Sequence, residues 1–292
     1  MKTENKLFLI LLVLISCTNH NNFDIQGHRG ARGILPENSI LGFIKSVDIG
    51  VKTIELDVVI TKDLKVLVSH EPWISNVICL DSLGLKLSDE INKYNIYNLN
   101  YDVIKKFDCG SLGNPNFSLQ KKISISKPLL KEAIIEVENY VKKNEIDYPN
   151  YNIEIKSSIS GENLFHPSYQ IFSDLVFAEL IKLISTKRFI IQSFDFRVLK
   201  YFNDKYPNVK LSVLVDNDYG SEKNLNDLGF SPNIYSPNFK KLSKSDINFL
   251  KKKNIEIIPW TVNSYDDITK VLKLNVDGII SDYPNRVIDI LR

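Results

Sequence analysis

The sequence lacks an excess of charge of either sign. Its 37 Lys and Arg residues stand against 35 Asp and Glu residues, which gives a formal net charge of +2, and the two signs are interspersed along the chain. Nucleic-acid binding requires basic residues concentrated on one face. The composition therefore predicts no nucleic-acid partner, and it makes no prediction about the oligomeric state.

The chain also lacks an apolar run long enough to cross a bilayer. The run Leu7–Ile15 has 9 residues, whereas a spanning helix needs roughly 20. It is typical of a secretory signal, and the Leu-Ile-Ser-Cys sequence that ends at Cys17 resembles a bacterial lipobox. We expect residues 1–16 to be a signal peptide, Cys17 to be lipidated, and residues 17–22 to tether the protein to a membrane, facing the periplasm or the cell surface. A plain signal peptide or an N-terminal anchor is the alternative.

Cysteine is scarce, with 3 residues in 292. If Cys17 carries lipid, Cys79 and Cys109 remain as an even pair in an oxidising compartment, where disulfides form. We therefore expect a disulfide that staples the segment around them, about residues 71–122, which interrupts the alternation of strands and helices. Two buried free thiols are the competing interpretation. A segment this long after a strand is either a substrate wall or a decorative subdomain.

The chain from residue 23 to residue 292 is long enough for one domain with a sizeable core. Short apolar runs typical of strands alternate with segments of helical spacing. Eight such runs contain, in chain order, His28, Glu55, Glu154, Gln192, Val213, Tyr235, Trp260 and Ile280. The sequence therefore predicts an α/β fold of the (β/α)8 TIM-barrel class, in which active sites lie at the C-terminal ends of the strands.

Acidic and apolar residues alternate in the predicted strand Thr53–Val58. Because a strand has a period of two, Glu55 and Asp57 face the same side. Two adjacent carboxylates repel each other unless a cation lies between them, and Mg²⁺ or Ca²⁺ prefers such oxygens. The same alternation places Glu154 and Lys156 on one face of a later strand, which offers a third oxygen ligand and a cation. Solvated faces of edge strands are the alternative.

Two histidines lie at the ends of predicted strands. His28 ends the first apolar run and is followed by Arg29. Between Glu55 and His70 there is no room for a helix, and the pattern predicts a turn and a short antiparallel strand, Val66–Val68. This hairpin brings His70 back toward the acidic pair. Because imidazole titrates near neutral pH, both histidines are candidates for acid/base catalysis; a core histidine bonded to the backbone is the alternative for His70.

Three further residues have more than one interpretation. Pro36 precedes a stretch of helical spacing, and Glu37 and Asn38 are placed to cap that helix. Trp260 lies near the end of a predicted strand over Ile255–Val262. It is either a core residue or a wall of the substrate site.

Together these residues resemble the glycerophosphodiester phosphodiesterase family, over nearly the whole chain from about residue 24 to residue 292. Ser39 stands where threonine is usual, and Glu71 follows His70 where aspartate is usual. The motifs that carry the resemblance are His28-Arg29-Gly30, Pro36-Glu37-Asn38-Ser39, Glu55-x-Asp57, Thr61-x-Asp63, His70, Glu154-x-Lys156, Gln192-Ser193-Phe194, Trp260-Thr261-Val262-Asn263 and Asp277-Gly278-Ile279-Ile280-Ser281-Asp282.

The resemblance implies metal-dependent hydrolysis of glycerophosphodiesters to an alcohol and glycerol phosphate, with one divalent cation, Mg²⁺ or Ca²⁺. It also implies that Glu37 orients the loop that carries His28. Either histidine is then the acid or the base, and either water or a neighbouring glycerol hydroxyl attacks. The expected site residues are His28 and His70 for acid/base catalysis, Glu55, Asp57 and Glu154 for the metal, and Arg29, Lys156 and Trp260 for phosphate and substrate.

Two other functions are compatible with the sequence. One is a phospholipase D-like or lysophospholipase activity on membrane lipids, which a tether at Cys17 would suit. The other is a lipoprotein that binds phosphorylated headgroups without chemistry. The second is disfavoured because a pure binding protein needs no pair of proton-transfer residues.

Overall fold

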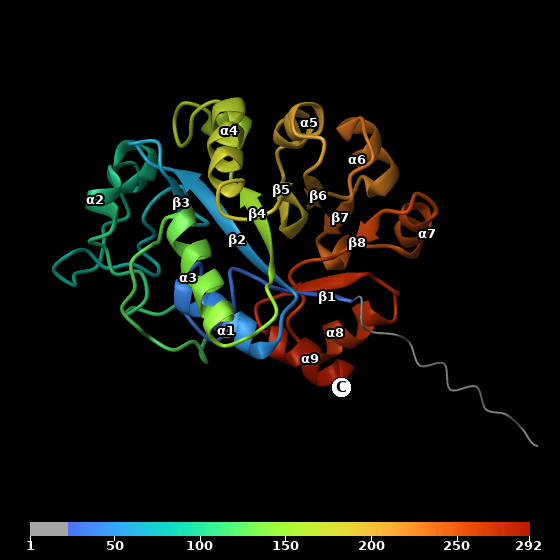
Figure 1. The fold of residues 1–292 in the computed structure, drawn as a ribbon, viewed down its shortest axis with the longest axis horizontal. Helices are drawn as coiled ribbons and strands as arrows, with labels where there is room; N and C mark the ends of the chain where they lie inside the picture. Colours follow the sequence, from blue (N-terminus) through green and yellow to red (C-terminus); the bar gives the residue numbers. More distant parts are fainter. Residues whose placement is uncertain (1–22) are drawn as a thin grey trace, which may run out of the picture.

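The computed structural model describes residues 23–292 (Figure 1). The predicted signal peptide, the lipidated Cys17 and the tether lie outside the described residues. Within residues 23–292, no helix is long and apolar enough to cross a membrane.

Strands and helices alternate through most of the described chain. The strands are β1 (Asp24–Gly27), β2 (Thr53–Ile60), β3 (Val66–Val68), β4 (Asn150–Ile155), β5 (Phe189–Ser193), β6 (Lys210–Val215), β7 (Ile234–Pro237), β8 (Glu256–Ile257) and β9 (Gly278–Ser281). The α-helices are α1 (Ile40–Ile49), α2 (Tyr101–Ile104), α3 (Leu130–Lys143), α4 (Tyr169–Leu180), α5 (Phe196–Lys205), α6 (Gly220–Leu228), α7 (Lys244–Lys252), α8 (Tyr265–Leu272) and α9 (Pro284–Leu291).

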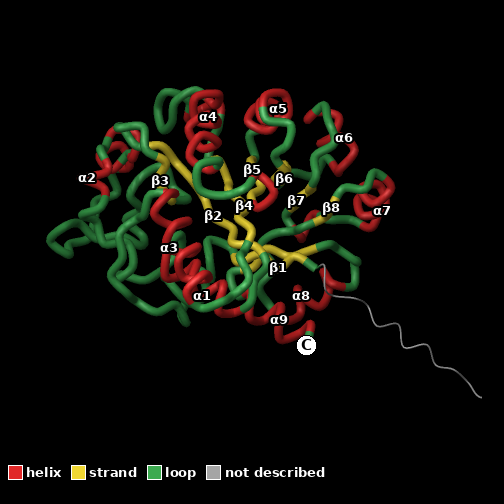
Figure 2. The backbone as a smooth tube through the Cα atoms, in the orientation of Figure 1, coloured by secondary structure: helices red, strands yellow, loops and turns green. Residues whose placement is uncertain are grey.

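The strands other than β3 form a parallel barrel in the order β8-β7-β6-β5-β4-β2-β1-β9. Single backbone hydrogen bonds complete the circle between β8 and β9: Asp277 N donates to Ile257 O at 2.9 Å, and Ile280 N donates to Pro259 O at 3.0 Å. Figure 2 shows the strands inside and the helices outside. The predicted (β/α)8 TIM barrel is confirmed.

The predicted hairpin on the second barrel strand is also confirmed. β3 pairs antiparallel with the end of β2, with Val68 opposite Val58 and Val66 opposite Ile60. The turn is tight because Leu64 adopts the left-handed conformation, at φ 55°. Beyond the hairpin, Ser69 N donates to Asp57 O at 3.0 Å. This bond directs the following residue back toward the acidic pair.

One predicted strand is much shorter in the structure. The pattern predicts a strand over Ile255–Val262, but β8 comprises only Glu256 and Ile257. Pro259 has no N–H to donate to a neighbouring strand. Beyond it, Trp260 forms only an isolated bridge with Asn238. The chain nevertheless stays in the barrel wall, because Trp260 N donates to Pro237 O and Val262 N donates to Ile280 O, both at 3.0 Å. The Trp260 side chain faces the cavity at the mouth of the barrel.

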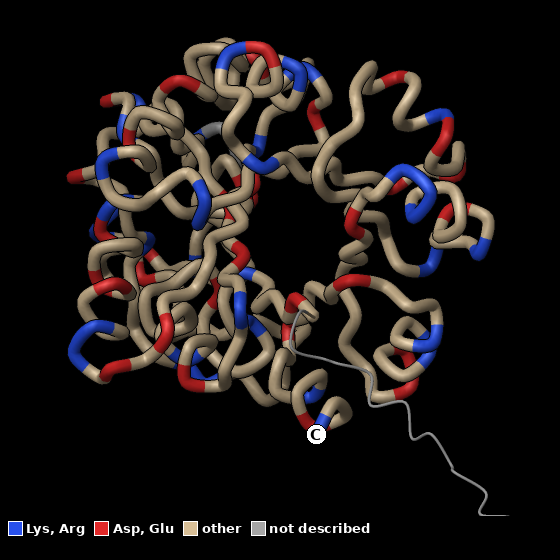
Figure 3. Tube along the Cα trace, turned by 45° about the vertical axis from the view of Figure 1, so that its right-hand side comes forward, with Lys and Arg blue, Asp and Glu red and all other residues tan. Residues whose placement is uncertain are grey.

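The two faces of the barrel strands differ as the alternation predicts. Ile54, Leu56 and Val58 of β2 are completely buried in the layer between the barrel and its helices. The alternate positions, Glu55 and Asp57, are buried inside the barrel. The edge-strand alternative is therefore wrong for this segment. The charges of the helical layer are mixed in sign (Figure 3).

The segment between β3 and α3 packs on the hairpin in a second hydrophobic cluster, in which Ile74, Ile96 and Ile104 join Val59 of β2 and Leu67 of β3. It carries α2 and two short 3-10 helices, Ile91–Tyr94 and Ile96–Asn98. In this segment Cys79 and Cys109 form a disulfide. The predicted insert therefore lies beside the barrel and covers the outer side of the β2–β3 hairpin, at the left of Figure 1.

Candidate active site

A cavity of about 210 Å³ lies at the C-terminal ends of the barrel strands. It is lined by every predicted barrel site residue except Asp57, which lies completely buried beneath it. A second cavity, of about 730 Å³, lies at the opposite end, where Asp24, Asn150 and Lys210 begin their strands. Because His28, His70, Glu55 and Glu154 line the first of these two cavities and not the second, the first cavity is the candidate active site.

Three carboxylates meet at the floor of the cavity. One oxygen each of Glu55, Asp57 and Glu154 lies within 4.8 Å of the others. All three residues are buried, and Asp57 Oδ1 has no hydrogen-bond partner among the described residues. Lys156 Nζ lies 3.7 Å from this oxygen, which is too long for a hydrogen bond. A buried carboxylate oxygen that accepts no hydrogen bond is costly unless a cation binds it. Three oxygen donors of this kind fit a hard divalent cation such as Mg²⁺ or Ca²⁺.

The pKa shifts of the three carboxylates also fit a divalent-cation site. Burial, together with the neighbouring carboxylates, raises the pKa of Glu55 well above its usual value. Burial also raises the pKa of Glu154, although Lys156 opposes this effect. Burial acts to raise the pKa of Asp57 too, but His70, Arg29 and Lys156 outweigh it and lower that pKa. A bound cation would relieve the repulsion that raises the first two values.

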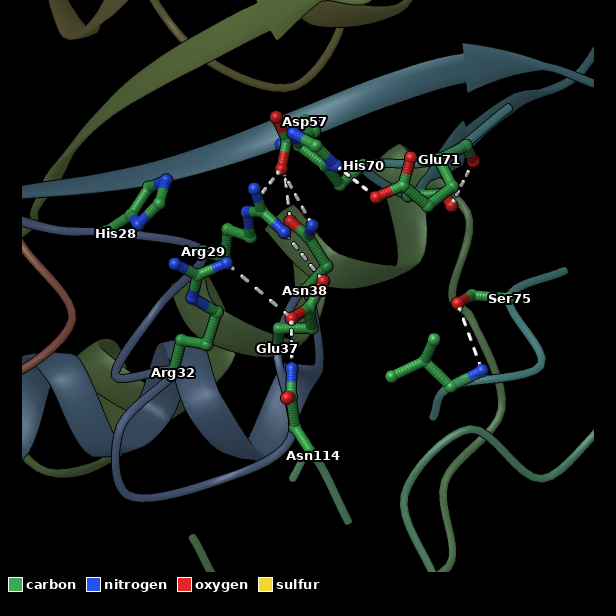
Figure 4. Close-up of polar contacts among 12 residues, drawn as sticks. His28, Arg29, Arg32, Glu37, Asn38, Asp57, His70, Glu71, Ser75 and Asn114 are labelled. Carbon is green, nitrogen blue, oxygen red and sulfur yellow. Dashed lines mark hydrogen bonds and ion pairs between the residues drawn. The ribbon is translucent and has the colours of Figure 1, made fainter. Parts of the chain in front are cut away.

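Asp57 is fixed by residues of the loop after β1. Asn38 Nδ2 donates to Asp57 Oδ2 at 2.8 Å, and Asp57 N donates to Asn38 Oδ1 at 3.2 Å. Arg29 Nε lies 3.3 Å from the same Oδ2, and Arg29 donates through NH1 to Glu37 Oε1 at 2.8 Å (Figure 4). The prediction that Glu37 and Asn38 cap α1 is wrong. Ser39 caps that helix instead, because its Oγ accepts a hydrogen bond from Gly42 N at 3.0 Å. The side chains of Glu37 and Asn38 contact Arg29 and Asp57 in the site.

The loop keeps its shape through unusual backbone conformations. Arg29 and Asn38 both adopt the left-handed region, at φ 49° and 52°, which costs about 1 kcal/mol or more per non-glycine residue. Asn38 N donates to Arg29 O at 3.0 Å, and Arg29 N donates to Glu55 Oε2 at 2.8 Å. Gly30 follows at φ 84°, where a Cβ would lie 2.8 Å from a backbone carbon of Gly42. Only glycine fits this close approach.

His28 is held by a carboxylate on its outer side. Its Nδ1 lies 2.6 Å from Asp282 Oδ1. Arg32 donates two hydrogen bonds to Asp282, at 2.8 and 3.1 Å, and Asn263 Nδ2 donates one at 2.7 Å. Burial acts to raise the pKa of Asp282, but His28 and Arg32 outweigh it, so that pKa is lowered. An ionised carboxylate only accepts, so Nδ1 carries the hydrogen and Nε2 is unprotonated.

The unprotonated nitrogen of His28 faces the acidic cluster, with Nε2 4.0 Å from Glu55 Oε2. Burial and the adjacent Arg32 lower the pKa of His28 to about 4, although Asp282 acts in the opposite direction. A histidine with this pKa is neutral at physiological pH. Its free nitrogen can therefore accept a proton from a group in the cavity.

His70 has a comparable partner. Its Nδ1 lies 2.7 Å from Glu71 Oε1. The side chain is 27% exposed, so the alternative of a core histidine bonded to the backbone is wrong. Burial acts to raise the pKa of Glu71, but the contact with His70 outweighs it and lowers that pKa. Glutamate, in the place where the family usually has aspartate, therefore still reaches the ring.

The two predicted phosphate-binding cations already contact carboxylates. Lys156 Nζ donates to Glu154 Oε1 at 2.7 Å and lies 3.7 Å from Asp57 Oδ1. Burial disfavours the charged form of Arg29, but Asp57 and Glu37 outweigh this and raise its pKa. Both cations therefore stay charged at the edge of the acidic cluster, where an anion would meet them.

Trp260 forms part of an apolar wall opposite these charges. Its Nε1 donates to Ser236 O at 2.9 Å, and its ring meets Phe194 edge to face, with centroids 5.5 Å apart. Both rings and Leu214 line the cavity. Trp260 is thus a wall residue, which was one of its two sequence interpretations.

Sequence reasoning missed three polar contributors to the site: Arg32, Gln192 and Asp282. Gln192 Nε2 donates to Glu55 Oε1 at 2.7 Å. Gln192 and Asp282 lie in motifs that carried the resemblance, but no local pattern gave them a role. Gln192 lies near the C-terminal end of β5, and Asp282 directly follows β9. In a TIM barrel this location indicates a site residue, and it is the feature from which both could have been predicted.

Known proteins resemble the chain over most of its length. A Bacillus altitudinis glycerophosphodiester phosphodiesterase is 27% identical, over 91% of this chain and 97% of the relative. A Silicibacter pomeroyi protein assigned as a glycerophosphoryl diester phosphodiesterase has a crystal structure that matches with a TM-score of 0.82 and 26% identity, over 92% of this chain and 93% of the other.

A more distant structure is that of an Oleispira antarctica phosphodiesterase in complex with the product sn-glycerol-3-phosphate. Its TM-score is 0.72 at 18% identity, over 92% of this chain and 96% of the other, and this likeness concerns the fold. The model of the "Glycerophosphoryl diester phosphodiesterase family" matches residues 28–286. The chain therefore belongs to the glycerophosphoryl diester phosphodiesterase family and is an enzyme of the phosphoric diester hydrolase class.

Proposed function

We propose that the protein hydrolyses glycerophosphodiesters to an alcohol and glycerol phosphate, with one bound divalent cation. The observation that carries the proposal is the cluster of Glu55, Asp57 and Glu154 between two histidines that are each held by a carboxylate. A phosphodiester is an anion, so the site must offset its charge, activate a nucleophile and protonate a leaving oxygen. When bound at the three carboxylates, the cation supplies Lewis-acid stabilisation of the phosphoryl oxygens.

The two histidines divide the proton transfers. His28 is neutral and presents an unprotonated Nε2, so we assign it as the base that accepts the proton of the nucleophile. His28 follows β1, whereas His70 follows β3. His70 interacts electrostatically with Asp57 and Glu154. Because His28 accepts the proton of the nucleophile, we assign His70, which also lines the cavity, as the acid that protonates the leaving alcohol.

The remaining side chains orient the substrate. Arg29 and Lys156 contact phosphate oxygens, Arg29 through its planar fork and Lys156 as a point charge. Trp260 and Phe194 cover the carbon atoms of the glycerol end. The small cavity, of about 210 Å³, with charge on one side and aromatic rings on the other, suits a compact polar diester.

The direct test is release of glycerol 3-phosphate from glycerophosphocholine by a soluble form that lacks residues 1–17. We expect no release after EDTA treatment, and recovery with added Mg²⁺ or Ca²⁺. His28→Ala and His70→Ala should each lose at least about 100-fold in kcat with the fold retained, and robust activity in either would refute the acid/base assignment. Greater activity on lysophosphatidylcholine would favour the lipid alternative, and binding without turnover would favour the headgroup-binding lipoprotein.

We also propose that Cys17 is lipidated after secretion and that the enzyme faces the periplasm or the cell surface. β1 begins at Asp24, at the end of the barrel opposite the active-site cavity. Six residues from Cys17 to Phe23 span at most roughly 20 Å, while a domain of this size is roughly 45–50 Å across. Such a tether directs the cavity away from the membrane, which favours water-soluble diesters over embedded lipids.

Cell fractionation tests the anchor. The wild-type chain should sediment with membranes, and Cys17→Ser should appear in the soluble fraction with an unchanged kcat on glycerophosphocholine. Mass spectrometry of the mature N-terminal peptide should detect a lipid-modified cysteine. An unmodified peptide that begins elsewhere would contradict the anchor without affecting the assignment of the active site.

A further inference from the structure

The interior of the barrel has an apolar part and a polar part. Ile190, Ile234, Ile258 and Ile280 form a small cluster inside the barrel. Elsewhere in the interior, on β1, β4 and β5, three amide side chains are almost completely buried: Gln26, Asn152 and Gln192. Buried amides in a barrel core are costly unless they are hydrogen-bonded.

The three amides form one continuous hydrogen-bond chain. Gln26 Nε2 donates to Asp24 Oδ2 at 2.8 Å. Asn152 Nδ2 donates both to Gln26 Oε1, at 2.8 Å, and to Gln192 Oε1, at 2.9 Å. Gln192 Nε2 then donates to Glu55 Oε1 at 2.7 Å. The chain connects a carboxylate at the lower end of the barrel with one of the three carboxylates at the candidate metal site.

Each end of the chain is a carboxylate whose two oxygens both accept hydrogen bonds. Asp24 accepts from Gln26 and, at 2.7 Å, from Thr53 Oγ1. Glu55 accepts from Gln192 and, at 2.8 Å, from the backbone N–H of Arg29. In every hydrogen bond that these two carboxylates make here, a carboxylate oxygen is the acceptor. The two glutamines must therefore turn their NH₂ groups outward and their oxygens toward the middle of the chain.

Asn152 lies between those two amide oxygens and must donate to both. Its own Oδ1 is left without a hydrogen-bond partner in the described part of the chain. An asparagine with a free choice of rotamer would avoid an unpaired buried oxygen. The arrangement therefore has one direction only, imposed by the carboxylates at its two ends.

We propose that Gln192 and Asn152 are positioning residues that hold the Glu55 carboxylate in the orientation required for divalent-cation binding. The proposal rests on the proposed function in one respect, that Glu55, Asp57 and Glu154 bind the cation. Gln192 is the direct donor. Asn152 acts through Gln192, because its two N–H groups prevent the Gln192 amide from turning its oxygen toward Glu55. Groups that orient metal ligands in this way typically affect metal affinity by about 10–100-fold.

Calorimetric titration of the metal-free full-length protein with CaCl₂ and with MgCl₂ tests the proposal. Gln192→Met removes the donor at similar volume, and Gln192→Asn keeps an amide but withdraws it by one methylene. Both variants should bind the cation about 10–100-fold more weakly than wild type. Asn152→Asp replaces the NH₂ donor by an oxygen that lies between two acceptor oxygens. It leaves the three carboxylate ligands unaltered in sequence, and it should weaken cation binding by roughly tenfold.

Ser212→Ala is the matched control. Ser212 is buried in the same interior and pairs with Gln192 in the strand register. Its Oγ has no hydrogen-bond partner among residues 23–292, and it does not belong to the chain. We expect its cation affinity to stay within twofold of wild type. Circular dichroism of each variant identifies any that is unfolded, and the two Gln192 variants provide independent tests.

The outcomes separate the two hypotheses. If wild type binds neither cation, the proposed metal centre is wrong, and the positioning role is refuted with it. If wild type binds but folded Gln192 and Asn152 variants keep wild-type affinity, only the positioning role is refuted. An equal loss in Ser212→Ala would also refute it, because the effect would then follow from general packing of the barrel interior.

Discussion

Asp282→Asn tests whether the carboxylate behind His28 is required for catalysis. In the native site the 2.6 Å contact between Asp282 Oδ1 and His28 Nδ1 places the hydrogen on Nδ1. An amide at position 282 can turn its NH₂ group toward that nitrogen, which transfers the ring hydrogen to Nε2. The nitrogen that faces the cavity would then have no lone pair for a proton.

The magnitude follows from the loss of the base. Loss of a positioned general base costs about 10²–10⁴-fold in rate. We therefore expect kcat for Asp282→Asn to fall by about 10²–10⁴-fold, with KM changed by less than about threefold. Asn263→Ala removes the hydrogen bond to the Asp282 carboxylate and the two that Asn263 Oδ1 accepts from Asp282 N and Ser281 Oγ. Because it leaves the carboxylate beside His28, its kcat should fall less than that of Asp282→Asn.

Two measurements decide the question. Steady-state kinetics on glycerophosphocholine give kcat and KM, and ¹⁵N NMR of labelled histidine reports which ring nitrogen of His28 carries the hydrogen. The double variant His28→Ala/Asp282→Asn should be no slower than His28→Ala, because both changes remove the same function. A folded Asp282→Asn enzyme with near-wild-type kcat and an unchanged tautomer would refute the reasoning.

Three further predictions concern the insert and the cavity wall. Replacing both Cys79 and Cys109 by serine opens a loop with a sequence separation of 30 and should destabilise the insert by roughly 3–4 kcal/mol; limited proteolysis should then cut there first, and unchanged resistance would contradict this. Burial acts to raise the pKa of Asp108, but hydrogen bonds from Ser111 and Gly110 outweigh it and lower that pKa to about 2. Its stabilising effect is therefore present above about pH 4 and is lost as the pH falls toward 2, and Asp108→Asn should abolish that part of the pH dependence of unfolding, about 1 kcal/mol after allowance for partial exposure. Trp260→Ala should raise KM by about 3–10-fold with kcat little changed; an unchanged KM would mean that the ring does not contact substrate.

The parts of the fold set by local periodicity could be predicted from the sequence. The two faces of β2 follow from the alternation of apolar and polar residues, and this predicted the acidic pair. The β2–β3 hairpin follows from a connection too short for a helix, and this predicted that His70 returns toward that pair. The contact between His28 and Asp282 was not, because 254 positions separate the two residues and only barrel closure brings them together.

Other errors came from residues whose local pattern fits two roles. Glu37 and Asn38 precede a helix, where polar residues are usually caps, yet both turn inward to Arg29 and Asp57. Pro259 has no N–H to donate and lies where the regular pairing of β8 has ended, although backbone hydrogen bonds to the neighbouring strands continue at Trp260 and Val262.

The packing of the insert on the hairpin has a consequence for how its sequence can vary. No residue of the insert lines the cavity, as far as the structure describes the chain. The insert contacts the site region through Asn114, which donates to Glu37, through Gln120, which donates to the carbonyl of Arg32, and through Phe117, which packs on the Arg32 guanidinium. Substitutions in the insert can therefore alter the cavity only indirectly, by moving Glu37 and Arg32.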